Sequence, residues 1–487
     1  MDATSKESKG FYKLSWLQRI GFGSGDFAQN LIYQTVMQYI SIFYTTVFGL
    51  NPLIVGVVML VATLLNLVWS LVLGTYVDKH TSKLGKYRSY LIIGGIPLTI
   101  FAILCFWNGF PGSTPYAFVT YIGLSLLYTV VNVPYGALHA SLTRDTDEIT
   151  KLTSTRMFLA NLGGFAVAFF IPSIVQSLSP DGKYNTPVAA HAWFITMSIY
   201  ALVGLVLLIF CFSQCRERVV MEADKTAEVK ISDLWMEFVR NRPLRVVAFF
   251  IFTAFTLMAI GNAAGPYYIS YNIDTARFQS FLQGLSDFIY AKTHLTISPT
   301  GVFQGLGSIP AFIFLPMVPA IKKAIGKKQM FYVFLSIAIF GMALLYVISV
   351  IPSLRSQIWL LLVAQFIKST GIIIATGYMW ALVPEVISFG EHTTGRRISG
   401  MVNAIIGIVF QAGMAVGLFI PNAILYFVGF NKDAVEQSTL TQQGILWLVA
   451  VLPALFLVLE MFIISKYELE DHVIDKINRE IEEKHLK

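Results

Sequence analysis

The chain contains about twelve runs of roughly 20 mostly apolar residues, and this repetition limits its possible folds more than any other feature. A run of that length crosses a bilayer as a helix, because a helix satisfies its own backbone hydrogen bonds in lipid. Only 13% of the residues are charged, whereas a soluble globular chain has about 25%, so a soluble fold is excluded. The sequence predicts an all-α membrane protein with about twelve transmembrane helices. The runs lie near residues 18–48, 53–75, 90–109, 116–143, 154–178, 190–213, 246–272, 299–321, 330–352, 356–387, 398–427 and 444–465.

These runs fall into two halves that are separated by a long, charged connection. Basic loops at residues 79–88 and 322–328 hold corresponding places in the two halves, and each contains a glycine. Such a weak internal repeat is typical of transporters built from two bundles. We therefore predict a cytoplasmic N-terminus (1–17), a first six-helix bundle (18–213), a cytoplasmic linker (214–245), a second six-helix bundle (246–465) and a cytoplasmic amphipathic tail (466–487).

The positions of Lys and Arg predict the orientation. About 29 of the 35 lie in loops on the side of the N-terminus, and about five lie on the opposite side. Because basic loops stay in the cytoplasm, we expect a multi-pass protein of the cell membrane with both termini cytoplasmic. The net charge of +7 is spread over short loops between apolar runs, which argues against nucleic-acid binding.

The sequence also excludes several kinds of chemistry. It contains no P-loop, HExxH, CxxC or GxSxG motif, so it offers no case for ATP-driven transport or for a membrane-embedded hydrolase. Its three cysteines have no disulfide or metal-ligand spacing. We expect no enzymatic activity, no metal and no cofactor.

Polar residues inside the apolar runs are the first candidates for function. The first run contains Asp26 together with the amides Gln29, Asn30, Gln34 and Gln38. A carboxylate in a bilayer costs several kcal/mol unless it faces a partner or a wet cavity, so it marks a functional site by default. Asp26 could accept hydrogen bonds from sugar hydroxyls, bind a cation or carry a proton; the alternative is a structural bond between helices.

Lys368, in the tenth run, is the second buried charge, and it also lies near the middle of the bilayer. Because a buried ammonium needs an acidic partner or a shifted protonation equilibrium, we hypothesise that Lys368 and Asp26 face one cavity from opposite halves. Lys368 could instead pair structurally or extend toward the interface.

Further candidates are uncharged or lie at the ends of runs. Two pairs of polar residues, Asn66 with Ser70 and Tyr128 with Asn132, are each spaced four apart and so share a helix face. Arg156 could bind substrate, form a gate or neutralise acidic residues at 145, 147 and 148. Trp380 could stack on a sugar ring, although a single tryptophan more often packs in a core.

Two cytoplasmic segments and one external segment have distinctive patterns. Gly74, Asp78 and Arg88 belong to a charged loop that could latch helix ends in one conformation, as a cytoplasmic gate. The tail carries apolar residues four apart, at 469, 473, 477 and 481, which predicts an amphipathic helix with a docking or a regulatory role. The external residues 271–298 are long and polar enough to contain a short helix.

Four motifs resemble the glycoside–pentoside–hexuronide:cation symporters, the melibiose-permease group of the major facilitator superfamily. The motifs are GDFAQN with FYTTVFGL in the first run, Gly74-x3-Asp78 through Gly85-Lys86-x-Arg88, Asn132-Val-Pro-Tyr-Gly-Ala-Leu to Lys151-Leu-x-Ser-x-Arg156-Met, and Phe389-Gly390-Glu391-x-x-Thr394-Gly395-x-Arg397-x-x-Gly400. The resemblance implies the major facilitator fold, alternating access and a sugar or glycoside substrate.

The resemblance also implies individual roles. Asp26 matches the sugar-binding aspartate of the family, and Arg156 matches an arginine at the inner side of the sugar site. Tyr128 and Asn132 match a tyrosine and an aspartate of that site, and Gln411 stands where the family has a lysine.

The chain departs from this family where a cation would couple. Two second-helix aspartates are replaced by Asn66 and Ser70, and a following proline is Leu71. Since a hard cation prefers charged oxygens, these replacements argue against sodium coupling, and proton coupling loses its obvious carriers. Lys368 could compensate for the missing lysine.

The sequence thus predicts a secondary or facilitative transporter of a sugar, glycoside or pentoside, with a proton or sodium as a possible partner. The alternatives are a transporter of an acidic glycoside or amphiphile that binds Lys368, and a sugar sensor that moves nothing. The expected pathway residues are Asp26, Asn30, Tyr33, Asn66, Tyr128, Asn132, Lys368, Trp380 and Gln411.

Overall fold

A computed structural model describes residues 12–80, 82, 84–143, 145–217, 231–394, 399–434 and 436–485. These residues are almost entirely helical, and among them the only β-type pairing is an isolated bridge between Ser82 and Gly85. The all-α prediction is therefore confirmed. The chain divides into two compact units, one formed by Met1–Lys225 with Leu282–Gly305 and the other by Thr226–Phe281 with Leu306–Lys487. Each unit is described by itself.

Within the described residues, ten helices are long and apolar enough to cross a membrane, and the segment Ser89–Cys105 is a shorter apolar helix. Helix α1 is 27 residues long but does not belong to the ten, because Asp26 and its neighbouring amides lower its hydropathy. Each predicted apolar run coincides with a helix or with a continuous series of short helices.

The first unit begins with α1, which the side chain of Ser15 caps by accepting a hydrogen bond from the backbone N–H of Gln18. A π-helical turn, Phe43–Val47, continues this helix. The other helices of the unit are α2 (Pro52–Lys79), α3 (Ser89–Ile93), α4 (Gly95–Cys105), α5 (Thr114–Leu142), α6 (Thr146–Leu178), α7 (Ala190–Gln214) and α11 (Gln283–Thr293).

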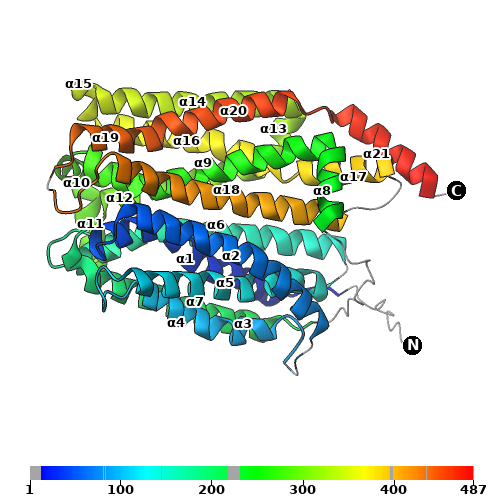
Figure 1. Ribbon diagram of the computed structural model, residues 1–487, viewed down its shortest axis with the longest axis horizontal. Helices are drawn as coiled ribbons and strands as arrows, with labels where there is room; N and C mark the ends of the chain where they lie inside the picture. The colour runs from blue at the N-terminus through cyan, green and yellow to red at the C-terminus, as the bar shows by residue number, and fades with distance from the viewer. Residues whose placement is uncertain are drawn as a thin grey trace. The chain divides into compact units, whose positions relative to one another are not determined.

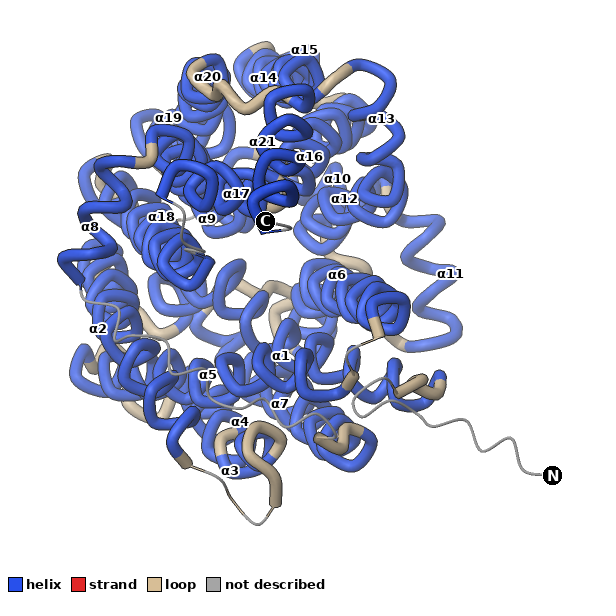
Figure 2. Tube along the Cα trace, turned by 90° about the vertical axis from the view of Figure 1, so that its right-hand side faces the viewer, coloured by secondary structure: helices blue, strands red, loops and turns tan. Residues whose placement is uncertain are grey.

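Helix α1 (Trp16–Ile42) is the centre of the first unit and packs against α6 and α7 (Figure 2). Two glycines permit this approach. A Cβ atom on Gly23 would lie 2.6 Å from Leu159 Cδ1 of α6, and one on Gly25 would lie 3.1 Å from Cys211 Sγ of α7. Small residues at such contacts let membrane helices pack closely, which brings Asp26 next to α6.

The second unit contains the remaining helices. They are α8 (Ile231–Arg240), α9 (Arg242–Asn272), α10 (Thr275–Phe281), α12 (Pro299–Phe314, of which the residues up to Gly305 belong to the first unit), α13 (Val318–Ile325), α14 (Lys327–Val350), α15 (Pro352–Arg355), α16 (Ile358–Met379), α17 (Leu382–Thr394), α18 (Ser399–Phe427), α19 (Thr439–Leu446), α20 (Leu452–Ser465) and α21 (Asp471–His485).

In this unit α14 packs against α16 and α20, and Figure 1 shows these three helices running alongside one another. Helix α9 packs against α18 in the same close manner, since a Cβ on Gly417 would lie 2.5 Å from the backbone oxygen of Thr256. The predicted tenth run is interrupted at Trp380 and Ala381, where α16 ends and α17 begins.

The segment that was predicted to be external and the C-terminal tail both contain helices. Residues 271–298 include α10 and α11, and the non-helical end of this segment is tied to α6 because Ser173 Oγ accepts a hydrogen bond from the Ser298 N–H at 3.1 Å. In the tail, α21 packs against α17. Ile474 and Ile477 are buried there together with Leu469, which precedes the helix.

Candidate functional site

Asp26 forms an ion pair with Arg156 of α6. The Arg156 Nε–H donates to Asp26 Oδ2, and the side chains of Asp26 and Arg156 are 9% and 33% exposed. The guanidinium lies 5.3 Å from the ring centre of Tyr135, whose hydroxyl donates to the Phe22 carbonyl at 2.6 Å. A cationic partner is what a carboxylate needs to remain charged inside a helix bundle.

Two of the acidic residues that the sequence offered as partners for Arg156 make other contacts. Glu148 is paired with Arg19 at 2.7 Å and with Lys151 at 3.1 Å. Asp145 instead caps α6 by accepting hydrogen bonds from backbone N–H groups. The side chain that Arg156 neutralises is therefore Asp26, and its position within the first unit is fixed by α1 and α6.

Tyr128 and Asn132 extend the polar cluster along α5. Asn132 Nδ2 donates to the Tyr128 hydroxyl at 3.2 Å and to Gln29 Oε1 at 3.0 Å. The ring of Tyr128 stacks on that of Tyr33, with 5.3 Å between the ring centres. The structure thus brings Tyr33, Tyr128 and Asn132 together, as predicted for pathway residues, and adds Gln29, which was not a predicted site residue.

A ladder of amides follows one face of α1. Asn30 Nδ2 donates to the carbonyl oxygen of Asp26 at 3.0 Å, and Asn30 Oδ1 accepts from Gln34 Nε2 at 3.4 Å. Gln38 continues the ladder by donating to Gln34 Oε1 at 3.4 Å. The spacing of four residues places these amides above one another on the helix.

Asn66 and Ser70 make neutral hydrogen bonds. Asn66 Oδ1 accepts from the Thr129 hydroxyl of α5 at 2.6 Å. Ser70 Oγ donates to the Leu67 carbonyl of its own helix at 2.9 Å. No group of three or more His, Cys, Asp or Glu residues suited to a metal ion occurs among the described residues.

In the second unit, Lys368 lies in the buried strip of α16 that packs on α14. A Cβ on Gly341 would lie 2.5 Å from the Lys368 backbone nitrogen, so the helices touch at this point. Asp26 and Lys368 belong to different units, and the pairing expected between them stays a prediction.

Trp380 and Gln411 are also in the second unit. Trp380 is 45% exposed, in the turn after α16, and its ring centre lies 5.9 Å from that of Phe255. Phe255 in turn contacts Phe410 with 4.4 Å between ring centres, next to the half-buried Gln411 on α18. Trp380 lies twelve residues after Lys368, or about 18 Å along the helix at 1.5 Å per residue, so these two predicted site residues are well separated.

The predicted gate loop is tied to the end of α7 by a residue that sequence reasoning missed. The carboxylate of Glu217 accepts hydrogen bonds from the backbone N–H groups of Lys86, Tyr87 and Arg88 at 2.9, 2.7 and 2.8 Å. Gly85, at φ +118°, makes the turn that aligns these three groups. Nothing lies within 4 Å of a Cβ placed on Gly74, and the side chain of Asp78 is outside the described residues, as are Gly395 and Arg397 of the fourth motif.

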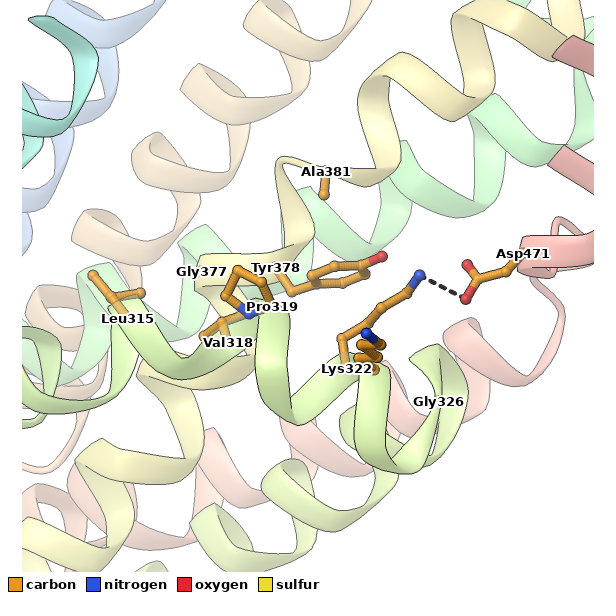
Figure 3. Close-up of a pocket in the computed structure, with 10 residues that line it drawn as sticks. Leu315, Val318, Pro319, Lys322, Gly326, Gly377, Tyr378, Ala381 and Asp471 are labelled. Carbon is orange, nitrogen blue, oxygen red and sulfur yellow. Dashed lines mark ion pairs between the residues drawn. The ribbon is translucent and has the colours of Figure 1, made fainter. Parts of the chain in front are cut away.

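A second charged cluster lies where the tail meets the second unit. A cavity of about 680 Å³ is lined there by Leu315, Val318, Pro319, Lys322, Lys323, Gly326, Gly377, Tyr378, Ala381 and Asp471. Figure 3 shows Asp471 at its edge, with its carboxylate 2.6 Å from Lys322 Nζ. Burial acts to raise the pKa of Asp471, but hydrogen bonds and charge from Lys322 and Lys327 outweigh it and hold the pKa below its ordinary value.

Comparison with known proteins agrees with this architecture. The pattern of the family described as MFS/sugar transport protein matches residues 21–471. The chain is 38% identical over 479 residues to the uncharacterized symporter YnaJ of Bacillus subtilis, which covers 98% of this chain and 96% of that protein. It is 29% identical over 482 residues to the glucuronide carrier protein homolog of Escherichia coli, covering 96% of both.

Among solved structures, the nucleoside transporter NupG has the same fold, with a TM-score of 0.59 and 14% identity over 93% of this chain and 100% of that chain. The apolar helices and the matching family pattern define a multi-pass membrane transporter of the major facilitator type. The chain belongs to the MFS/sugar transport protein family.

Proposed function

We propose that this transporter moves a sugar, glycoside or pentoside across the cell membrane by alternating access of its two halves, with both termini in the cytoplasm. The observation that carries the proposal is the Asp26–Arg156 ion pair beside Tyr33, Tyr128 and Asn132. Nothing in the proposed cycle requires a covalent step, so we propose transport without enzymatic activity and without a cofactor.

The chemistry of this cluster suits sugar hydroxyls. A hydroxyl both donates and accepts, and the cluster offers carboxylate and amide acceptors together with guanidinium and phenol donors. Charge-assisted hydrogen bonds to Asp26 and Arg156 would supply the stronger contacts, and the Tyr33 and Tyr128 rings would bound the site. Asn30 adds an amide on the same helix. From the second half we propose Lys368 as a further substrate contact, and Trp380 and Gln411 as pathway residues at a different depth.

Two features of the structure argue against a strong sodium site. Asn66 and Ser70 at the coupling positions are neutral, and the Asn66 amide oxygen already accepts from Thr129. A hard cation prefers carboxylates, so we propose facilitated transport or exchange, with proton coupling through Asp26 or Lys368 as the alternative.

We propose that Gly74, Asp78 and Arg88 form part of a cytoplasmic gate. The Glu217 carboxylate supports this assignment, because its hydrogen bonds hold the loop in a defined turn at the start of α3. Loss of these bonds would free the loop from α7.

Uptake by purified protein in liposomes tests the proposed function. Radiolabelled glucose, xylose, methyl β-D-xyloside and methyl β-D-glucuronide are supplied in turn, first without a gradient and then with a sodium or a pH gradient. We expect at least one to equilibrate faster than in empty liposomes. If one of these compounds binds but none crosses, the chain is a sensor and not a transporter.

A transporter of acidic glycosides is the second candidate, and the similarity to a glucuronide carrier homolog favours it. In that case Lys368 would bind the carboxylate of the substrate. Uptake of methyl β-D-glucuronide but not of methyl β-D-glucoside, with loss of that preference in Lys368→Met, would support this candidate. Equal uptake of both compounds would contradict it.

A further inference from the structure

Gln29 has a connection that the other amides of α1 lack. The residue is 1% exposed, and Gln29 Nε2 donates to the Gly25 carbonyl at 3.2 Å. Gln29 Oε1 accepts from Asn132 Nδ2 at 3.0 Å, and the same Nδ2 donates to the Tyr128 hydroxyl at 3.2 Å. These bonds form a relay from the backbone of α1 to two side chains of α5.

The backbone end of the relay determines the direction of every bond in it. A carbonyl oxygen can only accept, so Gln29 must turn its NH₂ group toward Gly25 and its oxygen toward Asn132. Asn132 must then donate, and both of its amide hydrogens are used by Gln29 and Tyr128. Reversing either amide would place two acceptors face to face and leave buried groups without partners.

The hydrogen bonds within the relay therefore determine which atoms of Asn132 and Tyr128 are left for a further partner. Asn132 keeps its Oδ1 oxygen, which only accepts, and Tyr128 keeps its hydroxyl hydrogen, which only donates. Asn132 and Tyr128 are half-buried, whereas Gln29 is fully buried. The relay therefore runs from a buried amide to two more exposed side chains, and the direction of its hydrogen bonds is the same throughout.

We propose that Gln29 is a positioning residue that sets the hydrogen-bond polarity of the substrate site: the substrate donates a hydroxyl hydrogen to Asn132 and accepts one from Tyr128. This inference rests on the proposed function, since it assumes that these two side chains contact a sugar. Gln29 itself does not touch the substrate.

The first test measures the relay without a substrate. Thermal unfolding is followed for Gln29→Leu, Asn132→Leu and the double variant, and for Thr35→Val alone and combined with Asn132→Leu. Thr35 is a matched control, because it is equally buried on α1 and its hydroxyl donates to the Leu31 carbonyl of its own helix. We expect the double variant at 29 and 132 to lose less stability than the two single variants lose together. The stability losses of Thr35→Val and Asn132→Leu should instead be additive. Additive losses in both pairs would overturn the relay.

The second test measures binding. Calorimetric titration of the wild type with methyl β-D-glucoside, methyl β-D-xyloside and methyl β-D-glucuronide identifies a probe. For that probe we expect about tenfold weaker binding by Gln29→Leu and an unchanged affinity for Thr35→Val, in line with one lost hydrogen-bond contact. Unchanged affinity in Gln29→Leu would overturn the positioning role. A wild type that binds none of the three contradicts the proposed function, while the unfolding cycle still decides the relay.

Gln29→Glu provides a conservative rescue. A protonated carboxylic acid has one donor and one acceptor, as the amide does, whereas a carboxylate only accepts. The variant should bind like the wild type at acidic pH and lose affinity as the pH rises and the new side chain ionises. Other titratable groups near position 29 could also make binding depend on pH. The wild type contains the same groups, so its pH profile serves as the reference; they are Asp26, Arg156, Tyr33, Tyr128, His139 and Cys211. Parallel profiles of the two proteins would contradict the relay.

Discussion

Lys327 Nζ lies 2.7 Å from Glu385 Oε2, and the side chains of the two residues are only 4% and 13% exposed. The same ammonium donates to the Leu469 carbonyl at 2.9 Å, and Glu385 accepts from the Tyr467 hydroxyl at 2.7 Å. The pair therefore joins the start of α14 to α17 and holds the segment that leads into α21.

Replacing Lys327 by methionine should release this segment. Lys327→Met leaves the Glu385 carboxylate buried without its cation, which should cost about 3 kcal/mol of stability. We expect a lower unfolding temperature and faster trypsin cleavage in α21, at the exposed Lys476 and Arg479. The control is Lys328→Met, whose partner Glu470 is 3.8 Å away and 54% exposed, so its loss should change stability by less than about 1 kcal/mol. A tail that stays protected in Lys327→Met would contradict this account.

Asp471 should make the attachment of the tail sensitive to acid. Its pKa in the folded protein is held below the ordinary value of 3.8 by Lys322 and Lys327. A carboxyl with a lowered pKa stabilises the folded state above its unfolded pKa, and this contribution is lost as the pH falls through the folded value. Because the side chain is 47% exposed, we expect less than about 1 kcal/mol.

The measurement compares the unfolding temperatures of the wild type and Asp471→Asn between pH 7 and pH 3. The wild type should be slightly more stable above about pH 5, and the difference should shrink as the pH falls below the ordinary carboxyl value. If the stability difference between the two proteins grows toward acidic pH, the predicted direction of the pH dependence is wrong.

The Asp26–Arg156 pair should behave as a coupled unit. Asp26→Asn leaves the Arg156 cation without its carboxylate, and Arg156→Met leaves the carboxylate without its cation. Each should lose about 1–3 kcal/mol, with the lower part of the range expected because Arg156 is one-third exposed. The double variant should lose less than the sum of the single losses, as double-variant cycles show for contacting residues. Additive losses in thermal unfolding would show that the two side chains do not interact.

The fold could be predicted from the sequence because lipid permits few solutions. Runs of about 20 apolar residues must be helices, so most helices follow from hydropathy alone. Helix α1 was predicted together with the other runs, although Asp26 and its amides lower its hydropathy. The break at Trp380 and Ala381 was not predicted, although Pro384 is a signal for it, because proline has no N–H to donate to the Trp380 carbonyl four residues earlier.

The site was partly predictable for a related reason. A carboxylate in an apolar run is conspicuous, and Asp26 was found in that way. The partner of Asp26 could not be found from the sequence. The choice between Arg156 and Lys368 depends on which helix approaches α1, and the packing at Gly23 and Gly25 decides which helix that is. From the sequence, Gln29 was not assigned a role different from that of the other amides of α1. Gln29 lies one residue before Asn30, which begins the ladder, and so faces another side of α1.

Tight packing through glycine gives a prediction that does not depend on function. Gly417 and Gly407 are both in α18, but a Cβ on Gly417 would lie 2.5 Å from the Thr256 oxygen and 2.6 Å from Ala259 Cβ, whereas nothing lies within 4 Å of one on Gly407. Gly417→Ala must push α9 and α18 apart, and overpacking of this kind costs about 1–3 kcal/mol.

Gly407→Ala adds only a helix-favouring methyl group, which should be neutral or should stabilise by up to about 1 kcal/mol. Thermal unfolding of both variants in the same detergent compares them directly, and the unfolding temperature should fall for Gly417→Ala while staying level or rising for Gly407→Ala. The two substitutions are chemically identical and ten residues apart on one helix. A general effect of alanine in lipid or detergent would therefore change both unfolding temperatures by the same amount. Equal shifts would mean that α9 and α18 do not touch at Gly417.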